Sequence, residues 1–316
     1  ASGNPILNWA TGKIWVNNHA HILSEKKGTS LRYLYYVLKG VNISSVVRGT
    51  PPKLNQKNLN NIIIPVPPLP VQEEIVRILD TFSELTAELT AELIAELAKR
   101  KQQYQYYRDA LLELKSDTVQ WKSFGSIASI VRGASPRPIS QYVTDEDDGV
   151  NWIKIGDVST GSKYVTSTKE KITRAGAKKS RFVKEGDFIL SNSMSFGRPY
   201  IMKTSGCIHD GWLSISQFET TYLSDFLYHL LNSSFVQKAF SQKASSGTVQ
   251  NLNADIVKSI ELPIPPLQEQ KRIVAILDRF DALCNDLTSG LPAEIEARKK
   301  QYEYYRDKLL TFKEAV

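Results

Sequence analysis

The chain has 316 residues, of which 41% are hydrophobic and 23% are charged, a composition typical of globular domains and not of disordered segments. No apolar run reaches the roughly 18–20 residues that cross a bilayer, no signal-peptide pattern opens the chain, and only Cys207 and Cys284 are present. We therefore expect no membrane partner, no disulfide framework and a cytoplasmic location. The net charge of +7 favours a polyanionic partner, because Lys and Arg displace counterions from phosphates.

The N-terminal residues 1–70 are predicted to be the C-terminal part of an α/β domain. Two of their segments match segments later in the chain: Gly3–Pro5 matches Gly197–Pro199, and the helical pattern Leu31–Leu38 matches Leu223–Leu230. The later copy extends about 75 residues further toward its own N-terminus. We therefore expect this first domain to be incomplete.

An internal repeat is the strongest feature of the sequence. Gly49–Leu114 aligns with Gly247–Phe312 without a gap at a shift of 198 positions, and 32 of the 66 aligned residues are identical. Unrelated segments would share only a few, so the alignment indicates duplication. The shared anchors are Pro-x-Pro-Pro-Leu (65–69 and 263–267), Ile-Val-x-Ile-Leu-Asp (75–80 and 273–278) and Gln-Tyr-x-Tyr-Tyr-Arg-Asp (103–109 and 301–307).

Each copy begins with a short apolar run that predicts a strand, at Ile62–Ile64 and at Ile260–Leu262. The proline cluster that follows ends the strand, because proline fixes φ and has no N–H to donate. A helical pattern comes next in both copies.

A helix from Ile75 to Leu114 would be about 60 Å long at 1.5 Å per residue. Its narrow apolar stripe runs through Phe82, Leu85, Leu89, Leu93 and Leu97 at a spacing of three or four residues. A stripe of this kind needs a second long helix, so we expect the two copies to pack as an antiparallel or splayed coiled coil. Ser289–Pro292 predicts a break in the second helix, since glycine can end one helix and proline begin the next.

Residues 118–268 lie between the two predicted helices, at 71–117 and 269–316, and form the second α/β domain. Strands are predicted at Val150–Ile155, Asp187–Leu190 and Trp212–Ser216, and a helix at Leu223–Phe240. The fold class is therefore α+β. Two irregular α/β domains, the first incomplete, are separated by two long helices packed as an antiparallel coiled coil with a pseudo-two-fold repeat.

Motifs of catalysis are missing from the sequence. There is no Walker A motif and no glycine-rich cofactor loop after a strand. The neighbours His209 and Asp210 suggest acid–base chemistry, but a surface turn is the simpler interpretation, and the paired His19 and His21 have no nearby carboxylate to complete a metal site. We predict no catalytic residue, no metal ligand and no cofactor bound by this chain.

Loops of the second α/β domain carry the groups that bind nucleic acid: guanidiniums, amides and hydroxyls on backbone shaped by glycine and proline. Gly247-Thr248 recurs at Gly49-Thr50 with different flanks, as expected of a shared turn between variable contacts, although the pair can equally serve only to cap a turn. Likewise, the basic run at 178–181 is open to interpretation as a solvated face. The candidate DNA-contacting residues are Arg48, Thr50, Lys53, Arg132, Ser135, Arg137, Lys178, Lys179, Arg181, Asn192, Ser193, Ser195, Arg198, Lys243, Ser245, Ser246, Thr248 and Asn251.

A tyrosine cluster recurs near the end of each repeat. Tyrosines on adjacent helical faces cannot all point inward, so some are expected to face a partner, as Tyr and Arg often do at interfaces. Packing within the helix pair is the alternative. The candidate partner-binding residues are Tyr104, Tyr106, Tyr107, Arg108, Tyr302, Tyr304, Tyr305 and Arg306.

The two copies of the proline, Ile-Leu-Asp and tyrosine anchors, each after a variable α/β domain, resemble the specificity subunit of type I restriction–modification systems. The run Leu85–Leu97, with its repeated Thr-Ala-Glu-Leu, resembles the central repeat of the IC branch of that family. The resemblance implies a non-catalytic subunit whose two target-recognition domains read the halves of a bipartite site in double-stranded DNA. It also implies docking of two modification (methyltransferase) subunits, which carry S-adenosylmethionine, and of restriction (translocase and nuclease) subunits.

Two other functions compete with this interpretation. A coiled-coil adaptor would bridge protein partners without reading DNA, and sequence-selective DNA binding would separate the two. The second alternative is a lone methyltransferase or nuclease fragment. Methyl transfer by the isolated chain would support it, but the absence of catalytic motifs argues against it.

Overall fold

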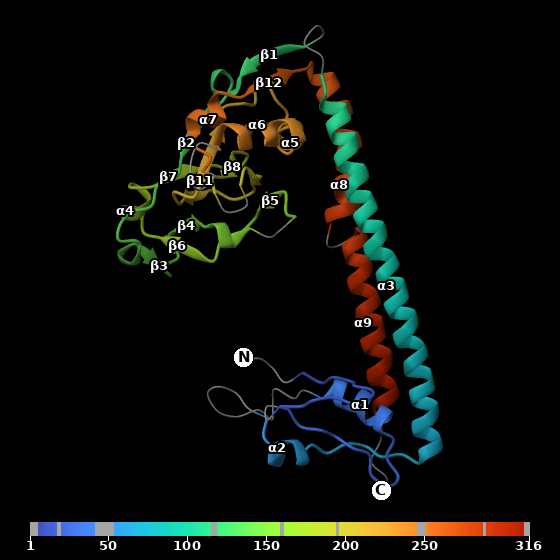
Figure 1. Ribbon diagram of the computed structural model, residues 1–316. Coiled ribbons are helices and arrows are strands. Elements are labelled where there is room, and N and C mark those ends of the chain that lie inside the picture. Colours follow the sequence, from blue (N-terminus) through green and yellow to red (C-terminus); the bar gives the residue numbers. More distant parts are fainter. Residues whose placement is uncertain are drawn as a thin grey trace. The chain divides into compact units, whose positions relative to one another are not determined.

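The computed structural model describes residues 6–17, 20–41, 54–114, 119–158, 161–193, 196–244, 251–286 and 289–312. The chain forms two compact units (Figure 1). The first unit comprises Ala1–Glu96 with Ala293–Val316, and the second comprises Leu97–Pro292. Both long helical segments are divided between the units, so the units differ from the predicted domains, whose boundaries at 70, 117 and 268 stay a prediction.

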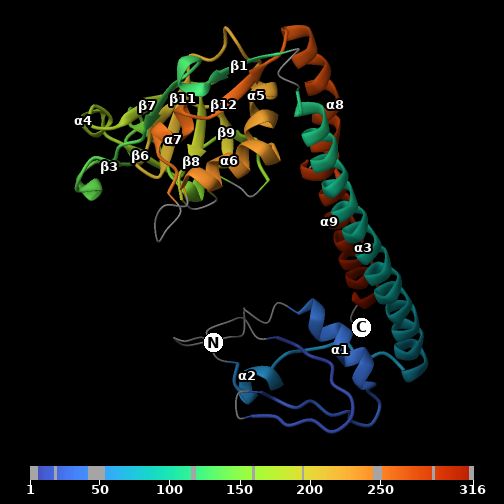
Figure 2. The same ribbon diagram turned by 45° about the horizontal axis from the view of Figure 1, so that its top comes forward.

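The second unit contains two five-stranded sheets and a two-stranded ribbon (Figure 2). One sheet has the order β3-β6-β4-β10-β7 and the other the order β2-β11-β8-β9-β5. The pairs β10–β4 and β5–β9 are parallel, and the others are antiparallel. The strands are β1 (Gln120–Ser123), β2 (Ser129–Arg132), β3 (Val143–Thr144), β4 (Val150–Ile153), β5 (Tyr164–Val165), β6 (Glu170–Ile172), β7 (Arg181–Val183), β8 (Phe188–Ser191), β9 (Pro199–Met202), β10 (Gly206–Ile208), β11 (Trp212–Ser216) and β12 (Glu261–Ile264).

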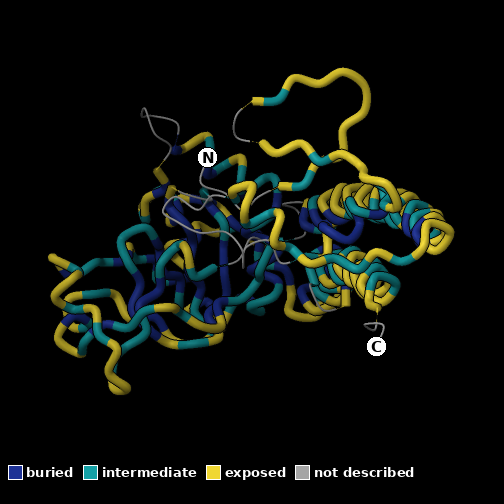
Figure 3. Tube along the Cα trace, turned by 90° about the horizontal axis from the view of Figure 1, so that it is seen from below, coloured by how far each residue is buried: buried dark blue, intermediate teal, exposed yellow. Residues whose placement is uncertain are grey.

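The sheet around β8 and β11 is buried on both faces. Phe188 and Leu190 join one hydrophobic core together with residues of the helices, whereas Ile189 and Trp212 join a second core with residues of the other sheet. The alternation follows from the two-residue period of a strand, and it leaves all four residues of β8 buried. Buried residues gather in the interior of this unit (Figure 3). The three strands predicted from the sequence are confirmed as β4, β8 and β11.

The predicted helix Leu223–Phe240 is wrong in one respect, because two helices occupy it. Helix α5 (Ser224–Leu231) and helix α6 (Ser234–Ala244) are separated by Asn232 and Ser233. Both side chains donate to carbonyls of the preceding turn, at 2.8 and 2.6 Å. Such local bonds compete with continuation of the helix.

Strand β1 pairs antiparallel with β12 and so joins the two ends of the second α/β domain. The strand predicted at Ile260–Leu262 is confirmed by β12, which follows helix α7 (Ala254–Lys258). The strand predicted at Ile62–Ile64 is wrong: this segment has no strand assignment, and the described residues of the first unit include no strand to pair with it. They do include helices α1 (Leu31–Gly40) and α2 (Gln56–Asn60).

The long helix of the first repeat is α3 (Leu69–Leu112), 44 residues without a break. The second repeat contains α8 (Leu267–Asn285) and α9 (Leu291–Leu310), so the predicted interruption is confirmed. Gly290 lies in that interruption, where an added Cβ would come within 2.6 Å of the Ala282 carbonyl. Besides these helices, the short helix α4 spans Arg174–Ala177.

Aromatic contacts show that α3 packs antiparallel to the helices of the second repeat. Within the second unit Tyr107 stacks on Phe280 of α8, with ring centroids 5.4 Å apart. Within the first unit Phe82 meets Tyr305 of α9 at 5.9 Å. In the same first unit Ser83 bonds to Tyr302, so the residue numbers run in opposite directions on α3 and α9, as expected from the repeat.

The apolar stripe predicted on α3 is only partly buried. Thr86 and Thr90 are half-buried, whereas Leu85 and Leu89 are 58% and 36% exposed. A four-residue repeat advances about 40° beyond one 3.6-residue turn, so its leucines drift around the helix. In the described residues no helix is both long and apolar enough to cross a membrane.

A buried glutamine near the start of each repeat fixes how α1 corresponds to α5. Gln72 Oε1 accepts the N–H of Ser30, and Gln270 Oε1 accepts the N–H of Leu223, both at 2.9 Å. Ser30 therefore corresponds to Leu223, a shift of 193. The expected match of Leu31–Leu38 to Leu223–Leu230, a shift of 192, is wrong by one residue, because a few shared leucines do not fix a helical register.

Candidate nucleic-acid interface

Three loops of the second α/β domain emerge at the same end of one sheet. Strand β2 ends there at Arg132, β8 ends at Ser191, and β11 begins at Trp212. The antiparallel pairing sets Arg132 opposite Leu213, and Ser191 opposite Trp212. Residues far apart in sequence, at 132–137, 191–193 and 209–211, therefore share one end of the sheet.

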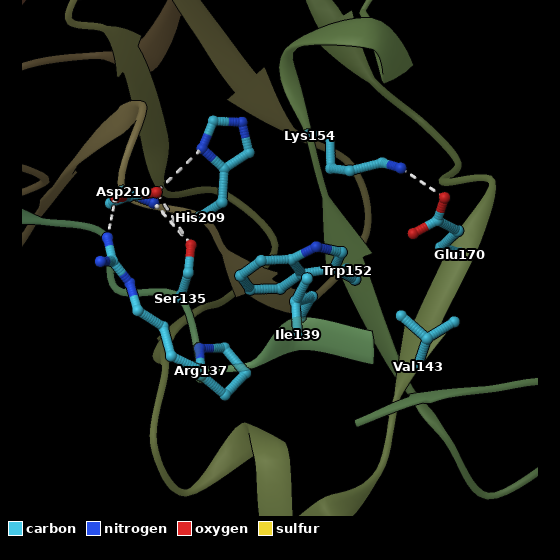
Figure 4. Close-up of a pocket in the computed structure, with 10 residues that line it drawn as sticks. Ser135, Arg137, Ile139, Val143, Trp152, Lys154, Glu170, His209 and Asp210 are labelled. Carbon is cyan, nitrogen blue, oxygen red and sulfur yellow. Dashed lines mark hydrogen bonds and ion pairs between the residues drawn. The ribbon is translucent and has the colours of Figure 1, made fainter. Parts of the chain in front are cut away.

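The Arg loop, residues 132–137, lies flat against the turn between β10 and β11 (Figure 4). The N–H of Gly133 donates to the Trp212 carbonyl at 2.8 Å, and the N–H of Ala134 donates to the Ile208 carbonyl at 3.2 Å. A Cβ at Gly133 would lie 2.1 Å from the carbonyl oxygen of His209. Only glycine permits this approach, because both sides of the contact are backbone.

We expect Gly133→Ala to destabilise the domain by about 1–3 kcal/mol, because the Cβ would force the Arg loop off the turn beneath it. Gly156→Ala is the control, since an added Cβ there meets nothing within 4 Å. Urea denaturation of both variants measures the difference. Equal stability of the two variants would contradict the close approach.

Asp210 accepts hydrogen bonds from side chains of two of these loops, the loop that follows β2 and the loop that follows β8. Its carboxylate accepts from Ser135 Oγ at 2.9 Å and pairs with Arg137 at 3.4 Å. Its backbone carbonyl accepts from Arg132 Nε at 3.1 Å and from Asn192 Nδ2 at 2.9 Å. The Ser135 hydrogen bond is the main reason that the pKa of Asp210 lies below its ordinary value. Asp210 thus holds both guanidiniums beside each other, although the sequence favoured only a turn at this position.

His209 is a packing residue and not half of an acid–base pair. Its Nδ1 lies 3.8 Å from Asp210 Oδ1, too long for a hydrogen bond, and accepts the N–H of Gly211 at 2.7 Å. Burial lowers the pKa of His209, which favours the neutral ring that this bond requires. Within the described residues no group of three or more His, Cys, Asp or Glu side chains could hold a metal ion.

A hollow of about 420 Å³ opens beside the Arg loop (Figure 4). Arg137 and Asp210 line one side, and the ion pair of Lys154 with Glu170 lines the other. Trp152, only 2% exposed, contributes apolar surface. The hollow therefore offers donors, acceptors and an aromatic surface within one small volume, and neither Lys154 nor Glu170 was among the residues expected from sequence.

The basic segment 178–181 lies against the Arg loop. Ser180 Oγ donates to the carbonyl of Ala134 at 2.6 Å, so the segment contacts the backbone of the Arg loop. The ammonium of Lys179 lies over the Tyr142 ring. The side chains of Lys178, Lys179 and Arg181 are all exposed.

The polar loop at 191–198 is split between buried and accessible residues. Asn192 is 4% exposed, and its carbonyl accepts the N–H of Leu252 at 2.8 Å. Its groups are therefore used within the domain, and its contact with DNA stays a prediction. Ser193 is exposed, and the Arg198 guanidinium lies 5.6 Å from the centroid of the Tyr200 ring.

Lys243 and Asn251, also expected to contact DNA, are both exposed. Lys243 donates to Ser259 Oγ at 2.8 Å. Seven of the expected DNA-contacting residues lie outside the described residues: Arg48, Thr50, Lys53, Ser195, Ser245, Ser246 and Thr248.

The tyrosine clusters present matching residues to solvent in the two repeats. Tyr106 and Tyr304 are 70% and 60% exposed, and Tyr107 and Tyr305 are each 40% exposed. Their positions differ by 198, so the same surface occurs on α3 and on α9.

The other members of the clusters are less accessible, two of them buried and two half-buried, and their contact with a partner stays a prediction. Tyr104 is 8% exposed and shares a hydrogen bond with His229 Nδ1 at 2.9 Å. Arg108 is 9% exposed. Tyr302 is half-buried and bonds to Ser83 Oγ at 2.9 Å, and the side chain of Arg306 is 13% exposed.

Comparison with known proteins matches most of the chain. The family model described as "Type I restriction modification DNA specificity domain" matches residues 6–99 and 117–297, one match per repeat. A protein of Haemophilus influenzae named as a type I restriction enzyme specificity subunit is 37% identical over 98% of this chain and 79% of its own length. The EcoR124I/EcoR124II specificity subunit of Escherichia coli is 35% identical over 90% of this chain and 71% of its own length.

Solved structures share the fold at low sequence identity. A chain from a structural study of complex assembly in a type I restriction–modification system superposes with a TM-score of 0.65 at 19% identity, covering 88% of this chain and 70% of that one. The HsdS subunit from Thermoanaerobacter tengcongensis gives a TM-score of 0.53 at 19% identity, covering 88% of this chain and 69% of that one.

Proposed function

Because the chain belongs to the type I restriction–modification DNA specificity family, we propose that it reads a bipartite site in double-stranded DNA and docks the subunits that act there. Membership makes it a specificity subunit, a non-catalytic component that recognises DNA sequence. Each α/β domain would read one half-site. Two modification subunits, which would carry the S-adenosylmethionine, and the restriction subunits would supply the chemistry in the cytoplasm.

The duplication is the observation that carries this proposal. Each family match contains the segment that precedes a long helical segment of the repeat and a part of that helical segment. The two exposed tyrosine pairs occur at equivalent positions. One chain therefore offers two copies of one surface, which suits two copies of one partner.

The end of the sheet that bears the Arg loop is the proposed DNA surface. The Arg137 side chain is 82% exposed, so it can leave its long contact with Asp210 for a guanine edge or a phosphate. The exposed Lys178, Lys179 and Arg181 belong to the segment that contacts this loop through Ser180, and they would neutralise phosphates.

We expect Arg137→Ala to weaken binding to the preferred site by about 1–3 kcal/mol and to relax one base position, as loss of a base contact does. Lys178→Ala should instead weaken binding to all DNA sequences alike. It should also reduce the slope of log affinity against log salt concentration by about the amount that one phosphate contact contributes. Selection from a random duplex library, followed by titrations at two salt concentrations, measures both.

Arg272→Ala is the control, because this exposed arginine pairs along its own helix with Glu269. If Arg137→Ala binds every duplex as the unmodified chain does, the Arg loop is not a DNA contact. If the unmodified chain selects no sequence at all, the coiled-coil adaptor is the better interpretation.

A further inference from the structure

Two buried glutamines make the same set of hydrogen bonds in the two units. Gln72 and Gln270 are both fully buried and correspond in the repeat. Each Oε1 accepts the amide that precedes a helix, α1 or α5. Each Nε2 donates to two carbonyls at 2.7–2.9 Å, those of Gly28 and Pro67 in the first unit and of Thr221 and Pro265 in the second. The side-chain amide is therefore fully used in both places.

An aspartate eight residues after each glutamine accepts a hydrogen bond from a side chain of the same helix, α1 or α5. Asp80 Oδ1 accepts from Tyr36 Oη at 2.5 Å and from Arg32 at 2.6 and 2.8 Å. Asp278 Oδ1 accepts from His229 Nε2 at 2.8 Å and lies 3.0 Å from Lys163 Nζ. Tyr36 and His229 are the sixth residues of α1 and α5.

A tyrosine from the opposite long helix completes each set. Tyr104 Oη bonds directly to His229 Nδ1 at 2.9 Å. Tyr302, its equivalent at a shift of 198, reaches Tyr36 through Ser83, over distances of 2.9 and 3.2 Å. The repeat thus supplies a glutamine, an aspartate and a tyrosine in both units. The helix that they hold supplies different partners, Tyr36 on α1 and His229 on α5.

The charges in the second set are strongly coupled. Burial alone would raise the pKa of Asp278, but hydrogen bonds from His229 and Lys163 outweigh it, and the pKa is lowered. Burial alone would likewise lower the pKa of Lys163, whose side chain is 10% exposed, but Asp225 and Asp278 outweigh it, and the pKa is raised. Removing the Asp278 charge would leave a largely buried ammonium with one carboxylate instead of two.

We propose that the repeat builds one socket twice, and that the socket residues are positioning residues. They fix α1 in the first unit and α5 in the second against the long helices. The two sockets consist of Gln72, Asp80 and Tyr302, and of Gln270, Asp278 and Tyr104. Each accepts a helix whose preceding amide is free to donate and whose sixth residue can donate to the aspartate. This inference rests on the proposed function for its consequence, because the angle at which each domain is held would limit the spacing of half-sites that the protein tolerates.

Distance distributions between spin labels test the second socket. One label pair, at Lys101→Cys on α3 and Lys178→Cys in the α/β domain, reports how firmly the domain is held. A second pair, at Lys178→Cys and Lys238→Cys, reports the fold of the domain itself. All three lysines are exposed, and the native Cys207 and Cys284 are buried. The full chain carries either Asp278→Asn or the control Glu269→Gln. The control removes a carboxylate on the same helix that pairs with the exposed Arg272.

We expect Asp278→Asn to broaden the 101–178 distribution roughly twofold and to leave the 178–238 distribution unchanged, because a local restraint is lost while the domain core stays intact. Glu269→Gln should change neither. An unchanged 101–178 distribution in Asp278→Asn would overturn the proposal, and so would broadening of both pairs, which would make Asp278 a residue of the domain fold. The measurement contains no DNA, so its outcome does not depend on the proposed function.

Discussion

Replacing Tyr106 and Tyr304 together by alanine is expected to abolish assembly with the modification subunit at micromolar concentration. The two side chains are 70% and 60% exposed and lie at equivalent positions of the repeat. Each meets its neighbouring tyrosine edge to face, Tyr107 at 5.5 Å and Tyr305 at 5.3 Å. Truncation of such an aromatic anchor at an interface costs about 2 kcal/mol or more, a loss of roughly thirtyfold at each site.

The single variants should separate the two sites. Tyr106→Ala and Tyr304→Ala should each reduce the number of bound modification subunits from two to one, measured by light scattering on the purified mixture. Phe182→Ala removes an aromatic side chain that is 52% exposed on β7 and should leave the stoichiometry unchanged. Methyl transfer from S-adenosylmethionine should be absent for the chain alone, appear with the partner and be lost in the double variant. A double variant that still binds two partners would remove the tyrosines from the docking surface.

Periodicity and turn chemistry in the sequence were enough to predict the main elements of the fold. The run Trp212–Ser216 is a strand because its residues alternate between two cores, and alternation is visible in one sequence. The break near Gly290 was predictable from local chemistry alone. The break after α5 was not predictable in this way. It depends on hydrogen bonds from the Asn232 and Ser233 side chains to backbone carbonyls, and the sequence does not show whether such bonds form.

The candidate site was predictable only in part, because its members meet across long sequence separations. The Arg loop stood out through its composition, but Asp210, which holds Arg132 and Arg137 together, lies more than 70 residues away. Asn192 has the chemistry of a base-reading residue, yet its amide is used inside the domain. Chemistry at one position therefore indicates what a residue can bind, whereas only packing decides which way it faces.

Shortening α3 by one tetrad is expected to shorten the gap between half-sites by roughly one to two base pairs. The tract contains three tetrads, Thr86–Leu89, Thr90–Leu93 and Ile94–Leu97, within one unbroken helix. Each adds about 6 Å at 1.5 Å per residue and about 40° of rotation. Since B-DNA rises about 3.4 Å per base pair, deleting Thr90–Leu93 removes a length of one to two base pairs. The sequences of the half-sites should not change, because the loops of the α/β domains are untouched.

A variant that keeps the length of α3 tests whether the tetrads set the gap between half-sites or only pack the helix pair. Replacing Thr90–Leu93 by four alanines keeps the helix and its length, since alanine is the strongest helix former, but removes the half-buried side chains of Thr90 and Leu93. We expect this variant to lower stability and to keep the gap, whereas the deletion changes the gap. Mapping of methylated sites for the assembled complex measures both. If the deletion methylates sites with the original gap, the tract serves only to pack the helix pair and does not set the spacing.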